Sequence, residues 1–200
     1  MFNYLIRVQL PDRPGALGAV ASRIGSVGGD VVSIDILQRD HGVVVDELGV
    51  GLAGDNLIDL VSDEILEVDG VSIESVRPIA GPMPDRGSEL LDVATALFEQ
   101  SSVSALLELL TVRVRQSLVA SFAAVIDADH SVVVASDGRQ PDHDVLDAGV
   151  GERPDLGVAP MTGAGLILVV VRGDPVLRHQ ERQWISTMAQ LADRSWKVLS

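Results

Sequence analysis

The sequence contains no cysteine, and this absence excludes several kinds of chemistry. Disulfides, thiolate nucleophiles and zinc or iron–sulfur sites with cysteine ligands are all ruled out. Aromatic residues make up only 3% of the 200 residues, whereas hydrophobic residues as a whole make up 46%. We therefore expect a globular protein of one large or two small domains, with an interior of Val, Leu, Ile and Ala.

Positive charge is also scarce, because Lys197 is the only lysine and the formal net charge is -14. Nucleic acids and anionic membranes are bound by basic surfaces, so we expect neither as a partner. The most apolar run, AGLILVVV at 164–171, is too short to cross a membrane. Residues 1–7 lack the basic start and apolar run of a signal peptide, and we expect a cytoplasmic protein.

The first 79 residues alternate between the hydrophobic periods of strands and helices. Strands are expected at 4–10, 31–38, 43–52 and 71–76, and helices with apolar positions spanning 17–27 and 57–68. Asp55 stands where it can cap the second helix. This βαββαβ order predicts a four-stranded sheet with both helices on one face and the opposite face open unless a partner covers it.

A segment rich in proline and glycine, AGPMPDRG at 80–87, predicts a linker between two domains. Beyond it we expect two helices between 88 and 117 with a break near Ser101 and Ser102, and then a second sheet. The expected later elements are a hairpin of 120–126 and 131–135, strands at 157–161 and 165–172, and a closing helix at 177–196. The whole chain therefore belongs to the α+β class.

The turn between the first strand and the first helix, LPDRPGAL at 10–17, is the most informative segment. Pro14 suits a helix start, and Gly15 removes the Cβ where the backbone would meet a ligand. The amides of Gly15, Ala16 and Leu17 belong to the first helical turn, where a carboxylate can accept from them. The carboxylate of Asp12 is placed to accept from an ammonium group. An alternative remains open, because Asp12 in this position can simply cap the helix.

The acidic and histidine residues of the second half do not form a recognisable catalytic or metal motif. The residues concerned are Asp127, Asp129, His130, Asp137, Asp142, His143 and Asp144. An Asp-x-Asp pair is ordinary turn chemistry, and the spacing does not match an EF-hand. No nucleophile elbow, P-loop or dinucleotide-binding motif is present. We expect no catalytic residue, no metal site and no cofactor.

The segments DRPGAL at 12–17 and GGDVV at 28–32, in a βαββαβ order, make residues 1–79 resemble an ACT domain. ACT domains are ligand-binding modules attached to many enzymes of amino-acid metabolism, and they bind amino acids where two copies meet. The resemblance implies that Asp12 accepts from the ligand's ammonium group and that the amides of Gly15, Ala16 and Leu17 take its carboxylate.

The same resemblance assigns two further positions to the ligand site. Asp30 would contact the ligand from the same or the neighbouring chain, and Leu10 stands where some relatives place a histidine. Relatives with characterised ligands often carry Asn at the positions of Asp12 and Asp30. The two carboxylates here favour an ammonium or another cationic group, so no serine-type specificity is implied.

Residues 88–198 resemble a small GAF domain, a sensory module with helices packed on a sheet. The features that carry this resemblance are the paired helices before the sheet, the hairpin AAVIDADH and the turn GDP before the last helix. There is no cysteine to attach a bilin and no cyclic-nucleotide motif. The resemblance therefore implies a GAF-like fold that is empty or binds a partner.

Together these patterns predict a non-enzymatic, homodimeric regulatory protein with an ACT domain at 1–79, a linker at 80–87 and a GAF-like domain at 88–200. An amino acid would bind at the dimer interface, and a partner enzyme or regulator would respond to the change. The alternative is a module for dimerisation and protein interaction that binds no ligand. An enzyme is the third reading, and no catalytic constellation supports it.

Overall fold

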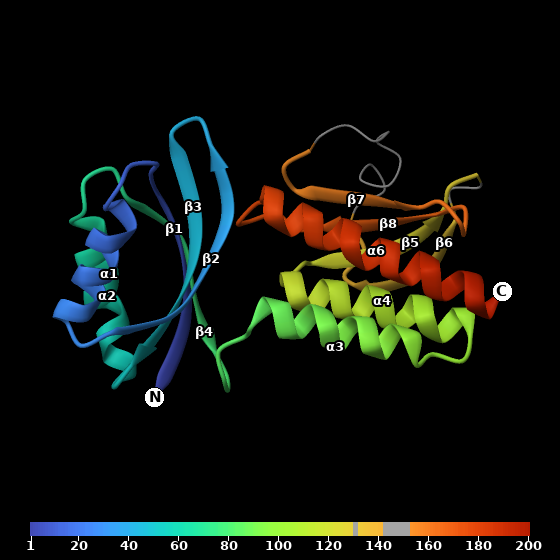
Figure 1. Ribbon diagram of the computed structural model, residues 1–200, viewed down its shortest axis with the longest axis horizontal. Helices are drawn as coiled ribbons and strands as arrows, with labels where there is room; N and C mark the ends of the chain where they lie inside the picture. The colour runs from blue at the N-terminus through green and yellow to red at the C-terminus, as the bar shows by residue number, and fades with distance from the viewer. Residues whose placement is uncertain (130–131, 142–152) are drawn as a thin grey trace. The chain divides into compact units, whose positions relative to one another are not determined.

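The computed structural model describes residues 1–129, 132–141 and 153–200. The chain divides into two compact units, unit 1 (Met1–Asp85) and unit 2 (Arg86–Ser200). The division falls inside the segment expected to be a linker, although Arg86 and Gly87 already belong to the first helix of unit 2. Each unit has its own sheet and its own helices (Figure 1).

Unit 1 has the βαββαβ order that the sequence predicts. Its elements are β1 (Phe2–Pro11), α1 (Ala16–Ser26), β2 (Asp30–Asp40), β3 (Val43–Leu52), α2 (Ile58–Leu66) and β4 (Ser72–Ile79). The strands pair in the order β2-β3-β1-β4, and every pairing is antiparallel. Both helices lie on the same face of this sheet (Figure 1). The strands β2 and β4 are therefore the two edges.

The core of unit 1 lies between the sheet and its two helices. Alternate residues of β1, from Tyr4 to Leu10, share this side of the sheet because side chains along a strand alternate between its faces. They pack against Val20 and Ile24 of α1 and against Val61 and Ile65 of α2. In both helices the apolar residues recur every three or four positions, which turns one face of each helix toward the sheet.

The start of the second helix differs from the expectation. Asp55 does not cap α2; its carboxylate accepts a hydrogen bond from the Tyr4 hydroxyl instead. Residues Asp55–Leu57 form a turn of 3₁₀-helix, and α2 begins only at Ile58. Tyr4 lies in the core, so its hydroxyl needs an acceptor, and Asp55 supplies one.

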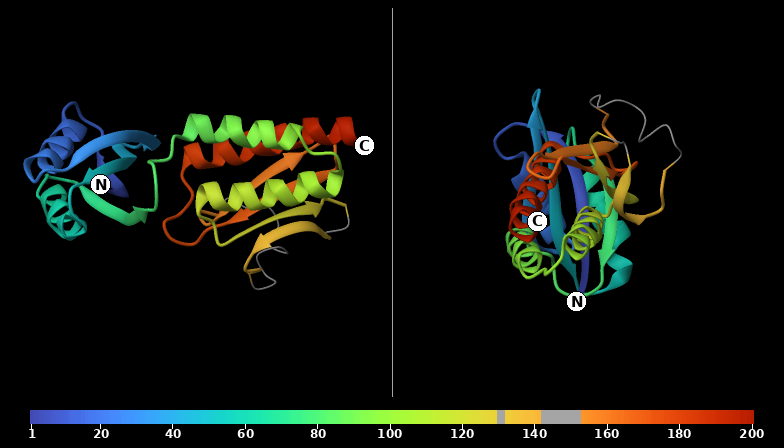
Figure 2. Two further views of the ribbon diagram at one scale, coloured as in Figure 1. Left: turned by 90° about the horizontal axis from the view of Figure 1, so that it is seen from below. Right: turned by 90° about the vertical axis from the view of Figure 1, so that its right-hand side faces the viewer.

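Unit 2 packs helices against a second antiparallel sheet. Its elements are α3 (Arg86–Phe98), α4 (Val103–Leu118), β5 (Phe122–Asp127), β6 (Val133–Gly138), β7 (Leu156–Met161), β8 (Leu166–Val171) and α6 (His179–Leu199). The strands pair in the order β6-β5-β8-β7. The helices α4 and α6 contact the strands, and α3 packs on those two helices (Figure 2). The expected break between the first two helices is confirmed, because Ser102 caps α4 by accepting from the Ala105 amide.

A buried ion pair joins the last strand to the last helix of unit 2. The guanidinium of Arg172 donates to both carboxylate oxygens of Glu181, at 2.7 and 2.6 Å. It also donates to the carbonyl oxygens of Leu118, Pro175 and Val176. Arg172 therefore links the end of α4, the loop before α6 and α6 itself.

None of the helices in the described ranges has both the length and the apolar character needed to span a membrane.

We predict that Glu181→Ala lowers the free energy of unfolding by about 3 kcal/mol, because it leaves a buried guanidinium without its counter-charge. Chemical denaturation followed by circular dichroism measures the change. Glu99→Ala is the matched control, since Glu99 is exposed and its removal is expected to cost less than about 0.5 kcal/mol. Equal stability of the two variants would contradict a structural role for the pair.

Candidate functional site

The turn between β1 and α1 is fixed by backbone hydrogen bonds to the neighbouring hairpin. The Asp12 amide donates to the Gly42 carbonyl at 2.8 Å, and the Arg13 amide donates to the Pro11 carbonyl at 2.8 Å. Gly15 precedes the helix with a φ of 87°, in the left-handed region that side chains with a Cβ adopt at a cost. The glycine is therefore required by the path of the chain at this point.

Asp12 does not cap the helix, so that alternative is wrong. Its carboxylate instead forms a two-bond ion pair with Arg39 at the end of β2. Arg39 Nε lies 2.8 Å from Oδ2, and Arg39 Nη2 lies 2.8 Å from Oδ1. The hydrogen bonds from Arg39 hold the pKa of Asp12 below its usual value. Arg39 is 27 residues from Asp12 in the sequence, and no local motif marks it as part of the site.

The first-turn amides are not all available to a ligand. The Ala16 amide donates to the Arg13 carbonyl at 3.2 Å, and the Ala16 side chain is buried in the core. Leu17 is partly buried against the same core. We expected the amides of Gly15, Ala16 and Leu17 to be free for a ligand. This was wrong for Ala16, because its amide already donates to a carbonyl within the turn.

Neither Leu10 nor Asp30 is placed to contact a ligand that would bind at this turn. The side chain of Leu10 is 4% exposed and belongs to the core, so it presents no surface to a ligand. Asp30 is exposed at the start of β2, where it pairs with Gly51, and Gly51 pairs with Asn3 of β1. From Asn3 to Pro11, next to the turn, the strand rises by about 27 Å. Asp30 of the same chain is therefore too far from Asp12 to share a ligand with it.

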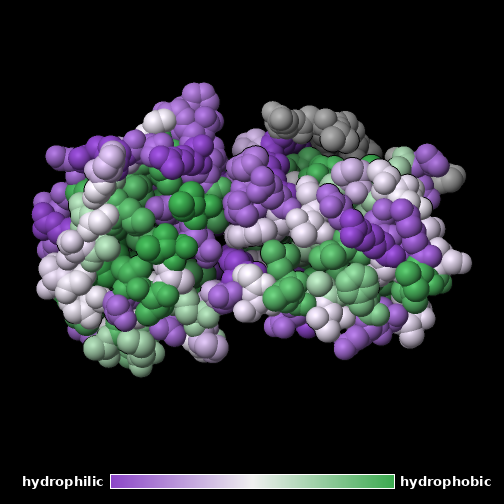
Figure 3. All heavy atoms as spheres, viewed as in Figure 1, coloured by the Kyte–Doolittle hydropathy of each residue, from purple (hydrophilic) through white to green (hydrophobic). Residues whose placement is uncertain are grey.

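The edge strand β2 carries a strip of exposed hydrophobic side chains. These are Val32, Ile34 and Ile36, and Ile34 is 46% exposed. Ile34 and Ile36 lie opposite Leu48 and Asp46 of β3, on the side of the sheet that the helices cover. Hydrophobic side chains also gather on the visible face of unit 1 in Figure 3. A long edge strand with exposed apolar side chains is a surface that favours pairing with another strand.

Asp46 is a buried carboxylate that the sequence analysis missed. It is 2% exposed and lies between Val44 and Leu48 on the helix-covered face of β3. Its Oδ1 atom has no hydrogen-bond partner among the residues that the structure describes. Burial disfavours the charged form and raises the pKa of Asp46 to about 6. The period-two pattern of VVVDELGVGL contains the signal, because it turns position 46 toward the core.

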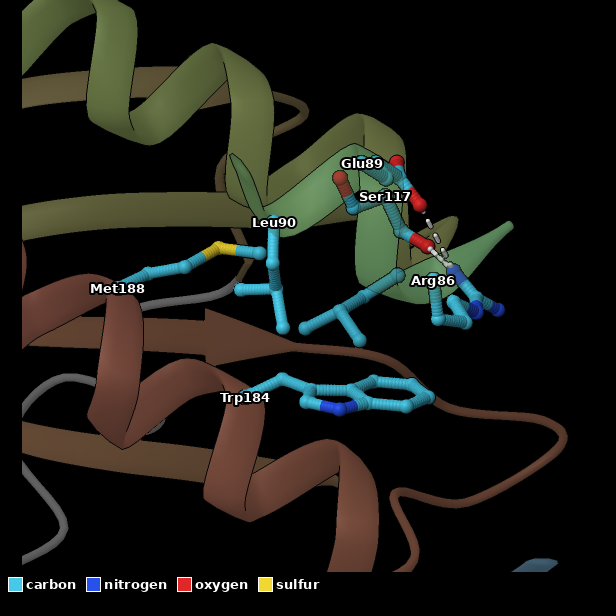
Figure 4. Close-up of a pocket in the computed structure, with 7 residues that line it drawn as sticks. Arg86, Glu89, Leu90, Ser117, Trp184 and Met188 are labelled. Carbon is cyan, nitrogen blue, oxygen red and sulfur yellow. Dashed lines mark hydrogen bonds and ion pairs between the residues drawn. The ribbon is translucent and has the colours of Figure 1, made fainter. Parts of the chain in front are cut away.

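Unit 2 contains a small pocket between α3, the end of α4 and α6 (Figure 4). Its volume is about 10 Å³, which is room for about one water molecule. The Arg86 guanidinium lies 4.9 Å from the centre of the Trp184 ring and donates to the Ser117 carbonyl at 2.6 Å. Trp184 thus packs in the interior, and this pocket is too small for a metabolite.

The acidic residues considered as metal ligands do not converge in the described part of the chain. No group of three or more His, Asp or Glu side chains is placed to hold an ion among residues 1–129, 132–141 and 153–200. Asp127 accepts from the Asp129 amide at 2.9 Å, which is ordinary turn chemistry. His130, Asp142, His143 and Asp144 lie outside the described residues.

We predict that Asp46→Asn becomes increasingly more stable than the wild-type protein as the pH rises. The pKa of Asp46 is about 6 in the folded protein and 3.8 ordinarily. Between pH 3.8 and pH 6 the folded protein therefore holds a proton that the unfolded chain has released. The contribution of Asp46 to stability is therefore full below pH 4 and is lost as the pH rises toward 6. The stability difference between the variant and the wild type is expected to grow by roughly 3 kcal/mol from pH 4 to pH 7.

Urea unfolding at several pH values measures this difference. Asp59→Asn on α2 is the control, because Asp59 is exposed and its replacement should give a nearly constant difference. A constant difference for Asp46→Asn as well would show that the carboxylate is not desolvated in solution.

Comparison with known proteins gives no family for this chain. No family model matches it, and no curated protein matches it significantly. Solved structures similar to it include the GAF domain from Acinetobacter phosphoenolpyruvate-protein phosphotransferase, with 12% identity and a TM-score of 0.46 over 58% of this chain and 95% of that one. The GAF domain of the Coxiella burnetii phosphoenolpyruvate-protein phosphotransferase gives 15% identity and a TM-score of 0.42, covering 56% and 92%.

A third similar structure is the chromophore-binding domain of a bacteriophytochrome from R. palustris. It has 11% identity and a TM-score of 0.43, covering 98% of this chain and 93% of that one. At these sequence identities and TM-scores, the similarity supports no conclusion about function. The α+β architecture with antiparallel sheets therefore rests on the strand pairing described above.

Proposed function

We propose that the protein is a non-enzymatic regulatory dimer whose unit 1 is an ACT domain that binds an amino acid at the β1–α1 turn. Unit 2 is, in this proposal, a GAF-like domain that passes the signal to a partner enzyme or regulator. The observation that carries the proposal is the Asp12–Arg39 pair, which places an anion and a cation side by side at the start of α1. An amino acid carries the complementary pair of charges.

The two ends of the ligand have separate partners in this arrangement. The ammonium group replaces Arg39 at the Asp12 carboxylate, and the released guanidinium and the amides of Gly15 and Leu17 receive the ligand's carboxylate. Asp30 contributes only from the neighbouring chain. Because such a ligand has few atoms and must displace an existing pair, its affinity is expected to be micromolar or weaker.

The strip on β2 provides the dimer interface in this proposal. An antiparallel pairing of β2 with a second copy, centred on Ile34, sets Ile34 opposite itself and Val32 opposite Ile36. The same register sets Asp30 opposite Gln38, so no like charges face each other. A shift of two residues would set Asp35 opposite Asp35, which is unfavourable. The turn with Asp12 is joined to this edge through Arg39.

A second candidate is an interaction module that binds no small ligand. The helix α3 supports it, because Leu91 and Phe98 are spaced by seven residues and are 71% and 60% exposed. Residues at this spacing share one face of a helix. In this reading the Asp12–Arg39 pair only fastens the turn to β2.

The first prediction from this proposal concerns the ligand. Titration calorimetry of the protein against each of the twenty amino acids is expected to give heat with at least one of them. Asp12→Ala should abolish that heat without changing the oligomeric state, since it removes the partner of the ammonium group. Asp59→Ala serves as the control for a lost exposed carboxylate. An absence of heat with all twenty, together with unchanged melting temperatures, would favour the interaction module.

The second prediction concerns the interface. Ile34→Lys is expected to convert the dimer to a monomer, because it places a charge at the centre of the apolar strip. Leu60→Lys on α2 is the matched control, since Leu60 is 45% exposed and Ile34 is 46% exposed. Sedimentation velocity distinguishes the two states. A dimer that survives Ile34→Lys would place the interface elsewhere.

A further inference from the structure

We propose that pairing of two copies through β2 is coupled to proton uptake by Asp46, so that mildly acidic pH favours the dimer. This inference rests on the proposed β2 interface and adds a means of regulating it. It follows from the place of Asp46 in the sheet, one strand in from the edge.

Asp46 is the direct neighbour of the exposed strip. It lies opposite Ile36 in the pairing of β2 with β3, and both side chains point to the same face of the sheet. Directly opposed residues have Cβ atoms about 4.5–5.5 Å apart. A second copy that covers Ile36 therefore also removes water from the neighbourhood of the Asp46 carboxylate.

Among the residues that the structure describes, no cation compensates the charge of Asp46. On its other side β1 presents Val8, and along β3 its neighbours on this face are Val44 and Leu48. Arg7 and Glu47 pair with each other one position away along the strands, on the opposite face of the sheet. The other charged or titratable groups near this face include Tyr4 on β1, Arg23 on α1, Asp59, Asp63 and Glu64 on α2, Asp55 before α2, and Arg39 on β2. Arg23 is paired with Glu64, and Arg39 is paired with Asp12. Burial is accordingly the cause of the raised pKa of Asp46.

Further burial in the dimer penalises the carboxylate and not the neutral acid. The pKa of Asp46 is then higher in the dimer than in the monomer, and the dimer binds more protons. Association is strongest below both pKa values and weakens as the pH rises through them. Each unit by which the pKa of Asp46 is higher in the dimer than in the monomer changes the dissociation constant by up to tenfold per copy. Two copies contribute to one dimer.

Sedimentation equilibrium at pH 5.5 and pH 7.5 tests the coupling. The wild type is expected to show a dissociation constant about tenfold or more lower at pH 5.5. Asp46→Asn should dimerise with nearly equal affinity at both pH values, because it has no proton to gain. Asp59→Asn is the control for the loss of one negative charge. His41→Gln is the second control, because it removes the imidazole that contacts Asp40 in the β2–β3 turn.

The possible outcomes separate the interface from the coupling. A wild-type dimer whose pH dependence persists unchanged in Asp46→Asn overturns the coupling and leaves the interface standing. A wild type that stays monomeric at both pH values overturns both. If Asp46→Asn does not fold, an NMR titration of the Asp46 carboxyl carbon decides the matter. Its pKa must be higher in the wild-type dimer than in the Ile34→Lys monomer, and equal values reject the proposal.

Discussion

The burial of one face of the first sheet beneath α1 and α2 is the constraint on which the rest of unit 1 depends. It fixes the direction of α1 and so brings the β1–α1 turn to the end of the sheet where β2 turns into β3. It leaves the edge strand β2 with exposed apolar side chains, because two helices do not cover four strands completely. It also buries most of Asp46 on β3, which is 2% exposed.

The Asp12–Arg39 pair changes the chemistry of the turn that the sequence suggested. Asp12 alone would be a site for cations, whereas the pair offers both an acceptor and a donor to a zwitterion. The Arg39 side chain is 67% exposed, and an exposed pair of this kind contributes little to stability. This weakness limits how strongly the pair holds the turn, and in the proposed function it allows a ligand to displace Arg39 from Asp12 at small cost.

Unit 2 is organised around internal packing. Arg172 satisfies a buried glutamate and three carbonyl oxygens, and Arg86 covers Trp184 beside a pocket with room for about one water. Asp193 on α6 accepts from the amides of Gly163 and Ala164 and so holds the β7–β8 turn against the helix. The exposed face of α3, with Leu91 and Phe98, is the surface of unit 2 on which the proposed interaction module depends.

The sequence by itself determined the order of the elements and the break near Ser102, whereas the left-handed φ that calls for glycine at position 15 was seen only in the structure. The order and the break depend on local period and backbone conformation, which a short stretch of residues encodes. Only the tertiary structure decided that Asp12 pairs with Arg39, that Asp30 lies at the far end of the sheet and that Oδ1 of Asp46 finds no hydrogen-bond partner among the described residues. Those facts depend on strand register and on helix placement, which join residues far apart in the chain and are set by packing as a whole.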